Sequence, residues 1–208
     1  FNAPFAAVIF VMEVVLREYK IHIFVPVMLA AACGSVLTRI VFGEVNELSF
    51  LSFNAFSQWM YFYLVLLGIL LGMLAVLFNS QLMRVMTWFR PVSMVWRLIL
   101  AALITGTIGM FIPEALGANF IDVEHLFDSS PGALLLVSTL VFKVILAVFA
   151  IGLGIPGGII GPVMVIGMLA GAVLLLPLSY FIDVPEFTNS VALLGIAGML
   201  TAVLHAPL

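Results

Sequence analysis

Seven apolar stretches separated by short polar segments dominate the pattern of the sequence. They cover residues 5–16, 25–42, 59–78, 98–112, 133–153, 159–182 and 191–204. Because a membrane-spanning helix needs roughly 20 mostly apolar residues, the pattern predicts spanning helices at the longer stretches and shorter helices elsewhere. Pro91 marks the expected start of the fourth helix. Long and short apolar helices broken by Gly and Pro are typical of transporters and channels.

The composition favours lipid as the solvent around these helices. Hydrophobic residues make up 65% of the chain and charged residues only 8%, whereas soluble domains average about 25% charged residues. The net charge of −3 and the lack of a basic run argue against a nucleic-acid partner. The single cysteine, Cys33, argues against a disulfide framework, and its small neighbours predict a packed position. Since the chain begins in mid-pattern at Phe1, we expect it to be a segment of a longer protein.

Charged residues alternate in sign between successive stretches. The basic groups are Arg17, Lys20, Arg84, Arg90 and Arg97, and the acidic groups between them are Glu44, Glu47, Glu114, Asp122, Glu124 and Asp128. Basic loops of membrane proteins tend to stay in the cytoplasm. The pattern therefore predicts that the loops near Arg17 and Arg90 are cytoplasmic, while residues 43–57 and 113–131 face outward.

Two glycine pairs have the spacing that lets membrane helices approach closely. They are Gly68 with Gly72, and Gly167 with Gly171. We interpret both pairs as close-packing positions.

The segment 152–162, which reads Gly-Leu-Gly-Ile-Pro-Gly-Gly-Ile-Ile-Gly-Pro, carries the most specific chemistry. Gly and Pro forbid a continuous helix here, and non-helical backbone at membrane depth is tolerated only inside protein or beside a wet cavity. A new helix is expected near Ile159, with Pro162 in its first turn. Its first amides lack intrahelical partners and carry roughly half a positive charge, which favours a small anion. The alternative is a Gly/Pro kink that serves packing alone.

At these residues the chain resembles the CLC family of chloride channels and chloride/proton antiporters. The family motif G-x-F-x-P reads Gly158-Ile159-Ile160-Gly161-Pro162 here, with Ile160 in place of the motif's Phe. Segments 1–13 and 195–208 resemble the family's helix H, and its helix O with the start of helix P. The chain would therefore be part of a single pore domain that lacks its N-terminal and C-terminal parts.

The resemblance implies an all-α integral membrane protein, a CLC-type inverted-repeat bundle of broken and tilted helices. It implies a homodimer with one pore per subunit, placed in the lipid bilayer of a bacterial inner membrane. It also implies that Gly158, Ile159, Ile160, Gly161 and Pro162 bind the anion through their backbone. Chloride or a similar small anion is the transported ligand, and we expect no cofactor, no metal and no nucleic-acid partner.

Two further positions are candidates for the transport pathway. In the family's antiporters, the internal proton-relay glutamate occupies the position that matches Val14, and the preceding acid matches Glu13. Glu13 could line the inner vestibule or pair with Arg17, one turn further on. Lys143 lies within an apolar stretch, where it could supply a positive potential for anions or form a structural ion pair.

The sequence thus favours passive chloride conduction over proton exchange, because valine cannot titrate. A chloride/proton antiporter is the alternative. An intramembrane enzyme is a remote alternative, since the aspartates fall in loop-like stretches and no Ser stands in a Gly-x-Ser-x-Gly motif.

Overall fold

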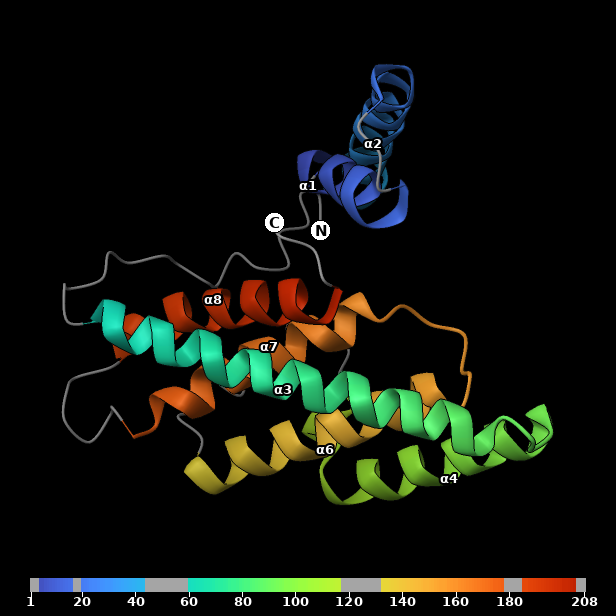
Figure 1. The fold of residues 1–208 in the computed structure, drawn as a ribbon, viewed down its shortest axis with the longest axis vertical. Helices are drawn as coiled ribbons and strands as arrows, with labels where there is room; N and C mark the ends of the chain where they lie inside the picture. Colours follow the sequence, from blue (N-terminus) through green and yellow to red (C-terminus); the bar gives the residue numbers. More distant parts are fainter. Residues whose placement is uncertain (1–3, 17–19, 44–59, 117–131, 178–184, 205–208) are drawn as a thin grey trace. The chain divides into compact units, whose positions relative to one another are not determined.

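The computed structural model describes residues 4–16, 20–43, 60–116, 132–177 and 185–204. It divides into two compact units: unit 1 comprises residues 1–50 and 204–208, and unit 2 comprises residues 51–203. Figure 1 shows the helices of both units. The described residues are helical, as the apolar pattern predicts, and no strand occurs among them. The single pore domain expected from the sequence stays a prediction.

Unit 1 is a short broken helix packed against a long one. Helix α1 (Pro4–Phe10) runs into a π-helical segment, η1 (Val11–Leu16), and α2 (Ile21–Phe42) follows. Val8 and Met12 are the buried side chains of α1 and η1, whereas α2 buries none. Cys33 is exposed, so the prediction of a packed cysteine is wrong for this unit. Small neighbours allow close packing, but among the described residues α2 packs against α1 without burying any of its own side chains.

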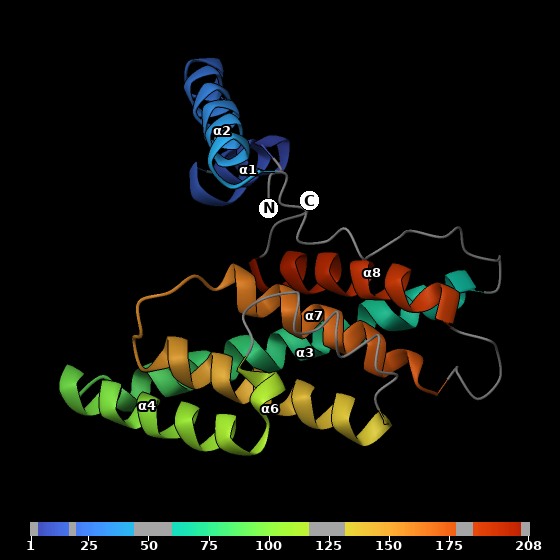
Figure 2. The same cartoon turned by 180° about the vertical axis from the view of Figure 1, so that it is seen from behind.

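Unit 2 holds the remaining helices around one buried helix. In chain order they are α3 (Met60–Phe89), α4 (Met94–Phe111), the 3₁₀ turn η2 (Pro113–Ala115), α6 (Ala133–Gly152), α7 (Ile160–Leu175) and α8 (Pro185–Leu204). Figure 2, the view from behind, shows α7 lying between α8 and α6. Every residue from Val163 to Ala172 is buried, so α7 is the core element of the unit.

Close contact between α7 and α8 depends on glycine. A Cβ on Gly167 would lie 2.4 Å from the carbonyl oxygen of Gly195, and one on Gly171 would lie 2.6 Å from that of Val191. Real side chains do not tolerate such distances, so only glycine permits this approach. The close packing expected of Gly167 and Gly171 is therefore confirmed.

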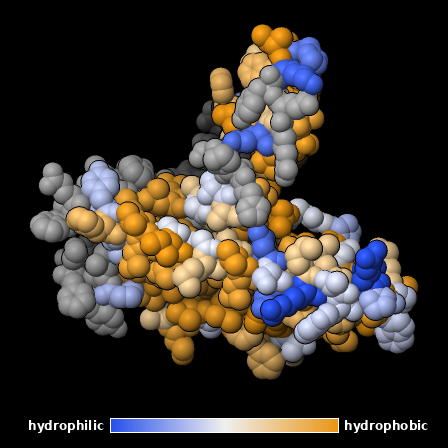
Figure 3. Space-filling view, viewed as in Figure 1, coloured by the Kyte–Doolittle hydropathy of each residue, from blue (hydrophilic) through white to orange (hydrophobic). Residues whose placement is uncertain are grey.

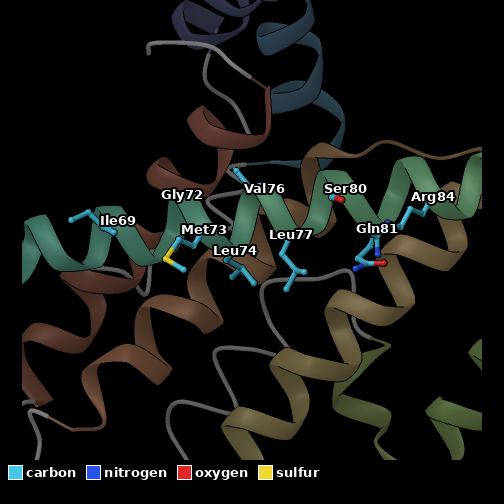
Figure 4. A pocket seen from close by; sticks show the side chains of 9 residues that line it. All are labelled: Ile69, Gly72, Met73, Leu74, Val76, Leu77, Ser80, Gln81 and Arg84. Atoms are coloured by element: carbon cyan, nitrogen blue, oxygen red, sulfur yellow. The ribbon is translucent and has the colours of Figure 1, made fainter.

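The other glycine pair behaves differently. A Cβ on Gly68 or Gly72 would meet no atom within 4 Å, so the expected close packing is absent from the described residues. Gly72 instead lines an open groove of about 880 Å³ along α3, together with Met73, Leu77 and Arg84. Figure 4 shows that the labelled side chains of this groove all come from α3.

Polar side chains join the helices of unit 2 at their ends. The Tyr63 hydroxyl on α3 donates a hydrogen bond to the carbonyl oxygen of Leu174, near the end of α7. The Asn79 side-chain amide donates to the carbonyl oxygen of Val203 at 3.3 Å. Terminal helix carbonyls lack intrahelical partners, so these bonds attach the ends of α7 and α8 to α3.

Four helices are long and apolar enough to cross a membrane: α2, α3, α4 and α6. The face of unit 2 seen in Figure 3 carries large hydrophobic areas beside a hydrophilic patch. The chain is thus a multi-pass integral membrane segment, as predicted. Helix α7 is shorter than the expected stretch 159–182, since it ends at Leu175 and Pro177 follows its C-cap.

Two boundaries differ from the sequence prediction. Helix α3 continues to Phe89 rather than ending near residue 78, so Arg84 lies in a helix and not in a loop. Pro91 lies in a turn, and α4 begins only at Met94, with Ser93 as its N-cap. The predicted stretch ended at residue 78 because polar residues follow it, but these residues belong to the same longer helix.

Candidate anion-binding site

Helix α6 ends in a backbone motif that satisfies its own terminal carbonyls. Gly154 has φ of 86°, the left-handed conformation that favours glycine. The Gly154 amide donates to Ile151 O at 3.0 Å, and the Ile155 amide donates to Ala150 O at 3.0 Å. This pair of bonds is a Schellman motif. The Leu153 amide also donates to Phe149 O at 2.9 Å, so the negative end of α6 is largely neutralised.

Helix α7 begins with the opposite arrangement. Its N-cap is Ile159, its first helical residue is Ile160, and Pro162 is the third. The first helix bond runs from the Val163 amide to Ile159 O at 3.1 Å. The amides of Ile160 and Gly161 precede that bond and have no acceptor within the helix. The predicted break and the predicted helix start near Ile159 are both confirmed.

The backbone leading into α7 is open. A Cβ on Gly157, Gly158 or Gly161 would meet no atom within 4 Å, and Gly157 and Gly158 are exposed. Ile160 and Gly161 are half-buried. Pro162 has no amide hydrogen, so it can shape the first turn but cannot donate to an anion. The described residues therefore present a helix N-terminus at a glycine-rich opening, an arrangement that suits a small anion.

Lys143 lies on α6, the helix before the connection, and is buried, with 5% of its surface exposed. Its ammonium group donates to the carbonyl oxygen of Ala115 in η2 at 3.0 Å. Lys143 also lines a cavity of about 160 Å³ together with Thr105 and Pro162. The fold thus brings the predicted electrostatic residue and the first turn of α7 to the same cavity.

Glu13 and Val14 belong to unit 1, where both are half-buried within η1. The sequence did not predict the π-helical turn that holds them, and π-helical turns are often found at functional sites. Arg17 lies outside the described residues, so the vestibule and ion-pair interpretations of Glu13 both stay predictions. His22 is exposed on α2, while His125 and His205 lie outside the described residues.

One residue was missed as part of this site. The charge pattern placed Arg97 among the basic residues that follow the third stretch, but it lies in the first turn of α4. Its Nη1 atom is 3.7 Å from the position that a Cβ would occupy on Gly154. Its position directly before the apolar stretch 98–112 is a signal that could have drawn attention to it.

Comparison with known proteins supports the resemblance over the whole sequence. The profile of the family described as "Voltage gated chloride channel" matches residues 1–208. A curated relative from Klebsiella pneumoniae subsp. pneumoniae, the H(+)/Cl(-) exchange transporter ClcA, is 30% identical over 226 residues; the match covers 100% of this chain and 46% of that protein. The protein of the same name from Salmonella paratyphi B is 28% identical over 231 residues, with the same coverage.

The chain therefore spans less than half the length of these relatives. The match nevertheless extends from its first residue to its last, and it includes the glycine-rich connection and the start of α7. The helical, membrane-spanning fold fits the same assignment. This chain belongs to the voltage-gated chloride channel family.

Proposed function

We propose that the full-length protein moves chloride or a similar small anion across the membrane. In this proposal, the chain supplies one wall of the pathway, where the backbone between Gly158 and Gly161 contacts the anion. The observation that carries the proposal is the start of α7, where the amides of Ile160 and Gly161 precede the first helix bond beside open glycine backbone. The matched relatives are named for chloride exchange, which supports chloride as the substrate.

A site made of amides suits transport better than a site made of a bare cation. Conduction requires binding that is favourable enough to admit an ion and weak enough to release it. Two amides at a helix N-terminus supply partial charge, and Lys143 adds a full charge that shares a cavity with Pro162 rather than occupying the opening itself. We therefore assign Lys143 an electrostatic role.

Chloride efflux from liposomes that contain the full-length protein tests this function. We expect chloride to leave protein-containing vesicles faster than it leaves protein-free vesicles under the same voltage clamp by valinomycin and potassium. Equal rates in both preparations would contradict the proposal. Efflux would also separate transport from the remote alternative of an intramembrane enzyme, which the relatives' names do not favour.

For the mode of transport we propose proton-coupled exchange, the alternative in the sequence analysis, ahead of passive conduction. The support is the printed function of the relatives, H(+)/Cl(-) exchange. Val14 favours passive conduction, because it cannot titrate. Glu13 is the adjacent acid, and it is half-buried in a π-helical turn, a feature often found at functional sites. We assign it the internal proton relay.

Imposing a chloride gradient while recording external pH decides between the two modes. Exchange predicts uphill proton movement at a fixed ratio to chloride, and Glu13→Gln should abolish that proton movement while chloride still flows. Chloride flux without any proton movement would restore passive conduction as the better description. Proton movement that survives in Glu13→Gln would place the relay elsewhere.

The family also supports a proposal for the oligomeric state, the membrane and the orientation of the pore. We propose a homodimer in the bilayer of a bacterial inner membrane, with Arg17, Lys20, Arg84 and Arg90 on the cytoplasmic side. Positions 44 and 124, which lie outside the described residues, would face outward. Cysteines introduced singly at positions 44 and 84 should react with an impermeant maleimide from opposite sides, and labelling from the same side would contradict this orientation.

A further inference from the structure

Arg97 is a half-buried cation at an unusual place in its helix. It lies in the first turn of α4, where its amide donates to Ser93 O at 3.2 Å. The positive end of the helix dipole disfavours a basic side chain there. The stability of α4 therefore does not explain why this position carries an arginine.

The guanidinium of Arg97 reaches the connection between α6 and α7. Its Nη1 atom lies 3.7 Å from the position of a Cβ on Gly154. Its Nε atom is buried and has no hydrogen-bond partner among the described residues. Buried donors in folded proteins are nearly always paired, so an unpaired donor in a guanidinium that reaches the Gly154 turn points to a ligand.

The alternative explanation is that Arg97 neutralises the negative end of α6. At that end, the carbonyls of Phe149, Ala150 and Ile151 already accept the amides of the three residues that follow the helix. No hydrogen bond or ion pair of Arg97 with a carboxylate occurs among the described residues either. Capping of α6 thus leaves the guanidinium, and its buried Nε donor in particular, without a function.

We propose that Arg97 binds a small monovalent anion at the Gly154 turn. This is a second anion-binding site on the pathway that leads to the amides of α7. This inference rests on the proposed function. Gly154 and Ile160 are six residue steps apart, which span at most roughly 20 Å, so the Gly154 turn and the α7 opening belong to one short connection. The guanidinium is weakly hydrated and presents several N–H donors. Arg97 raises the local anion concentration and so lowers the chloride concentration needed for transport.

The test is the chloride dependence of efflux from liposomes that contain the full-length protein. The neutral variant is Arg97→Gln, the charge-preserving variant is Arg97→Lys, and the matched control is Arg84→Gln, an exposed arginine of the α3 groove. We expect Arg97→Gln to raise the half-saturating chloride concentration about three- to tenfold at low ionic strength, with the maximal rate within about twofold of the wild type. Arg97→Lys should restore most of the affinity, and Arg84→Gln should leave it unchanged.

Several outcomes would overturn the proposal. An unchanged half-saturating concentration in a folded Arg97→Gln protein would do so, and so would equal shifts in Arg97→Gln and Arg84→Gln. If Arg97→Gln does not fold, Arg97→Met, which keeps the apolar stem, replaces it. Failure of both neutral variants to fold, while Arg97→Lys folds, would assign Arg97 to structure alone. A wild-type protein that moves no chloride would refute the proposed function itself, whereas an active wild type with an unaffected Arg97→Gln would refute only this inference.

Discussion

The two ends of the connection between α6 and α7 are built in opposite ways. At the α6 end, the carbonyls of Phe149, Ala150 and Ile151 all accept backbone amides, and Gly154 completes the motif with a positive φ. At the α7 end, the amides of Ile160 and Gly161 have no acceptor within the helix. Both ends belong to neighbouring apolar helices, and glycine is abundant at both.

Glycine therefore serves two purposes within this one short segment. Gly154 closes a helix by adopting a conformation that other residues rarely adopt. Gly157, Gly158 and Gly161 instead keep space free, since a Cβ on any of them would touch nothing. At the α6 end, backbone amides thus cover the negative end of the helix dipole. At the α7 end, the positive end of the helix dipole stays accessible, which favours anions over cations.

The largest effect is expected when a donor is removed at the α7 end. Gly161→Pro removes one amide hydrogen within the first helical turn, where proline is tolerated. A hydrogen bond to a charged group contributes about 1.5–3 kcal/mol, so we expect chloride affinity to fall by roughly tenfold to a hundredfold. Isothermal titration of the full-length protein with chloride measures it.

Gly161→Ala is the matched control, because it keeps the amide and its added Cβ meets open space. We expect its chloride affinity to stay within about twofold of the wild type, because the donor amide remains and the added methyl group meets no protein atom. Equal losses in Gly161→Pro and Gly161→Ala would show that the backbone donor is not what binds the anion.

An intermediate effect is expected at the α6 end, and on stability rather than on affinity. Gly154→Ala forces a Cβ into the left-handed region and should destabilise the protein by about 1–2 kcal/mol. Gly157→Ala serves as the control, because Gly157 has no positive φ and its Cβ would meet no atom. Thermal unfolding in detergent should show a lower midpoint for Gly154→Ala only, and equal midpoints would contradict the closing role of Gly154.

The smallest effect is expected from the charge next to the first turn of α7. Lys143→Met should weaken chloride binding only a few-fold, because the ammonium group acts through space and not as a ligand. It also leaves Ala115 O without this donor, so stability must be recorded alongside affinity. Lys143→Arg should keep chloride affinity close to that of the wild type. A loss in Lys143→Met as large as that in Gly161→Pro would instead make Lys143 a direct ligand.

Local rules explain which features the sequence could predict. Gly and Pro determine backbone conformation by themselves, so the break at 152–159 and the start of α7 were predictable. The spacing of Gly167 and Gly171 predicted close packing, and the structure supplies α8 as their partner. The same spacing at Gly68 and Gly72 failed, because spacing shows that a helix could approach and does not show that one does.

The remaining features depend on tertiary contacts. The apolar stretch predicted for this helix stops at residue 78, but α3 continues past Asn79, and the Asn79 amide donates to Val203 O. Arg97 looked like an ordinary loop cation, and only the fold reveals that its guanidinium lies beside Gly154. A contact between residues 57 positions apart leaves no local trace in the sequence, so this part of the candidate site could not be predicted.

The most direct test of the central claim is a crystal structure of the full-length protein grown in bromide, with anomalous diffraction recorded at the bromine edge. Bromide substitutes for chloride and reports its own position. The account predicts an anomalous peak within hydrogen-bonding distance, about 3.0–3.5 Å, of the backbone nitrogens of Ile160 and Gly161. Bromide peaks elsewhere in the protein, with none at the start of α7, would contradict it.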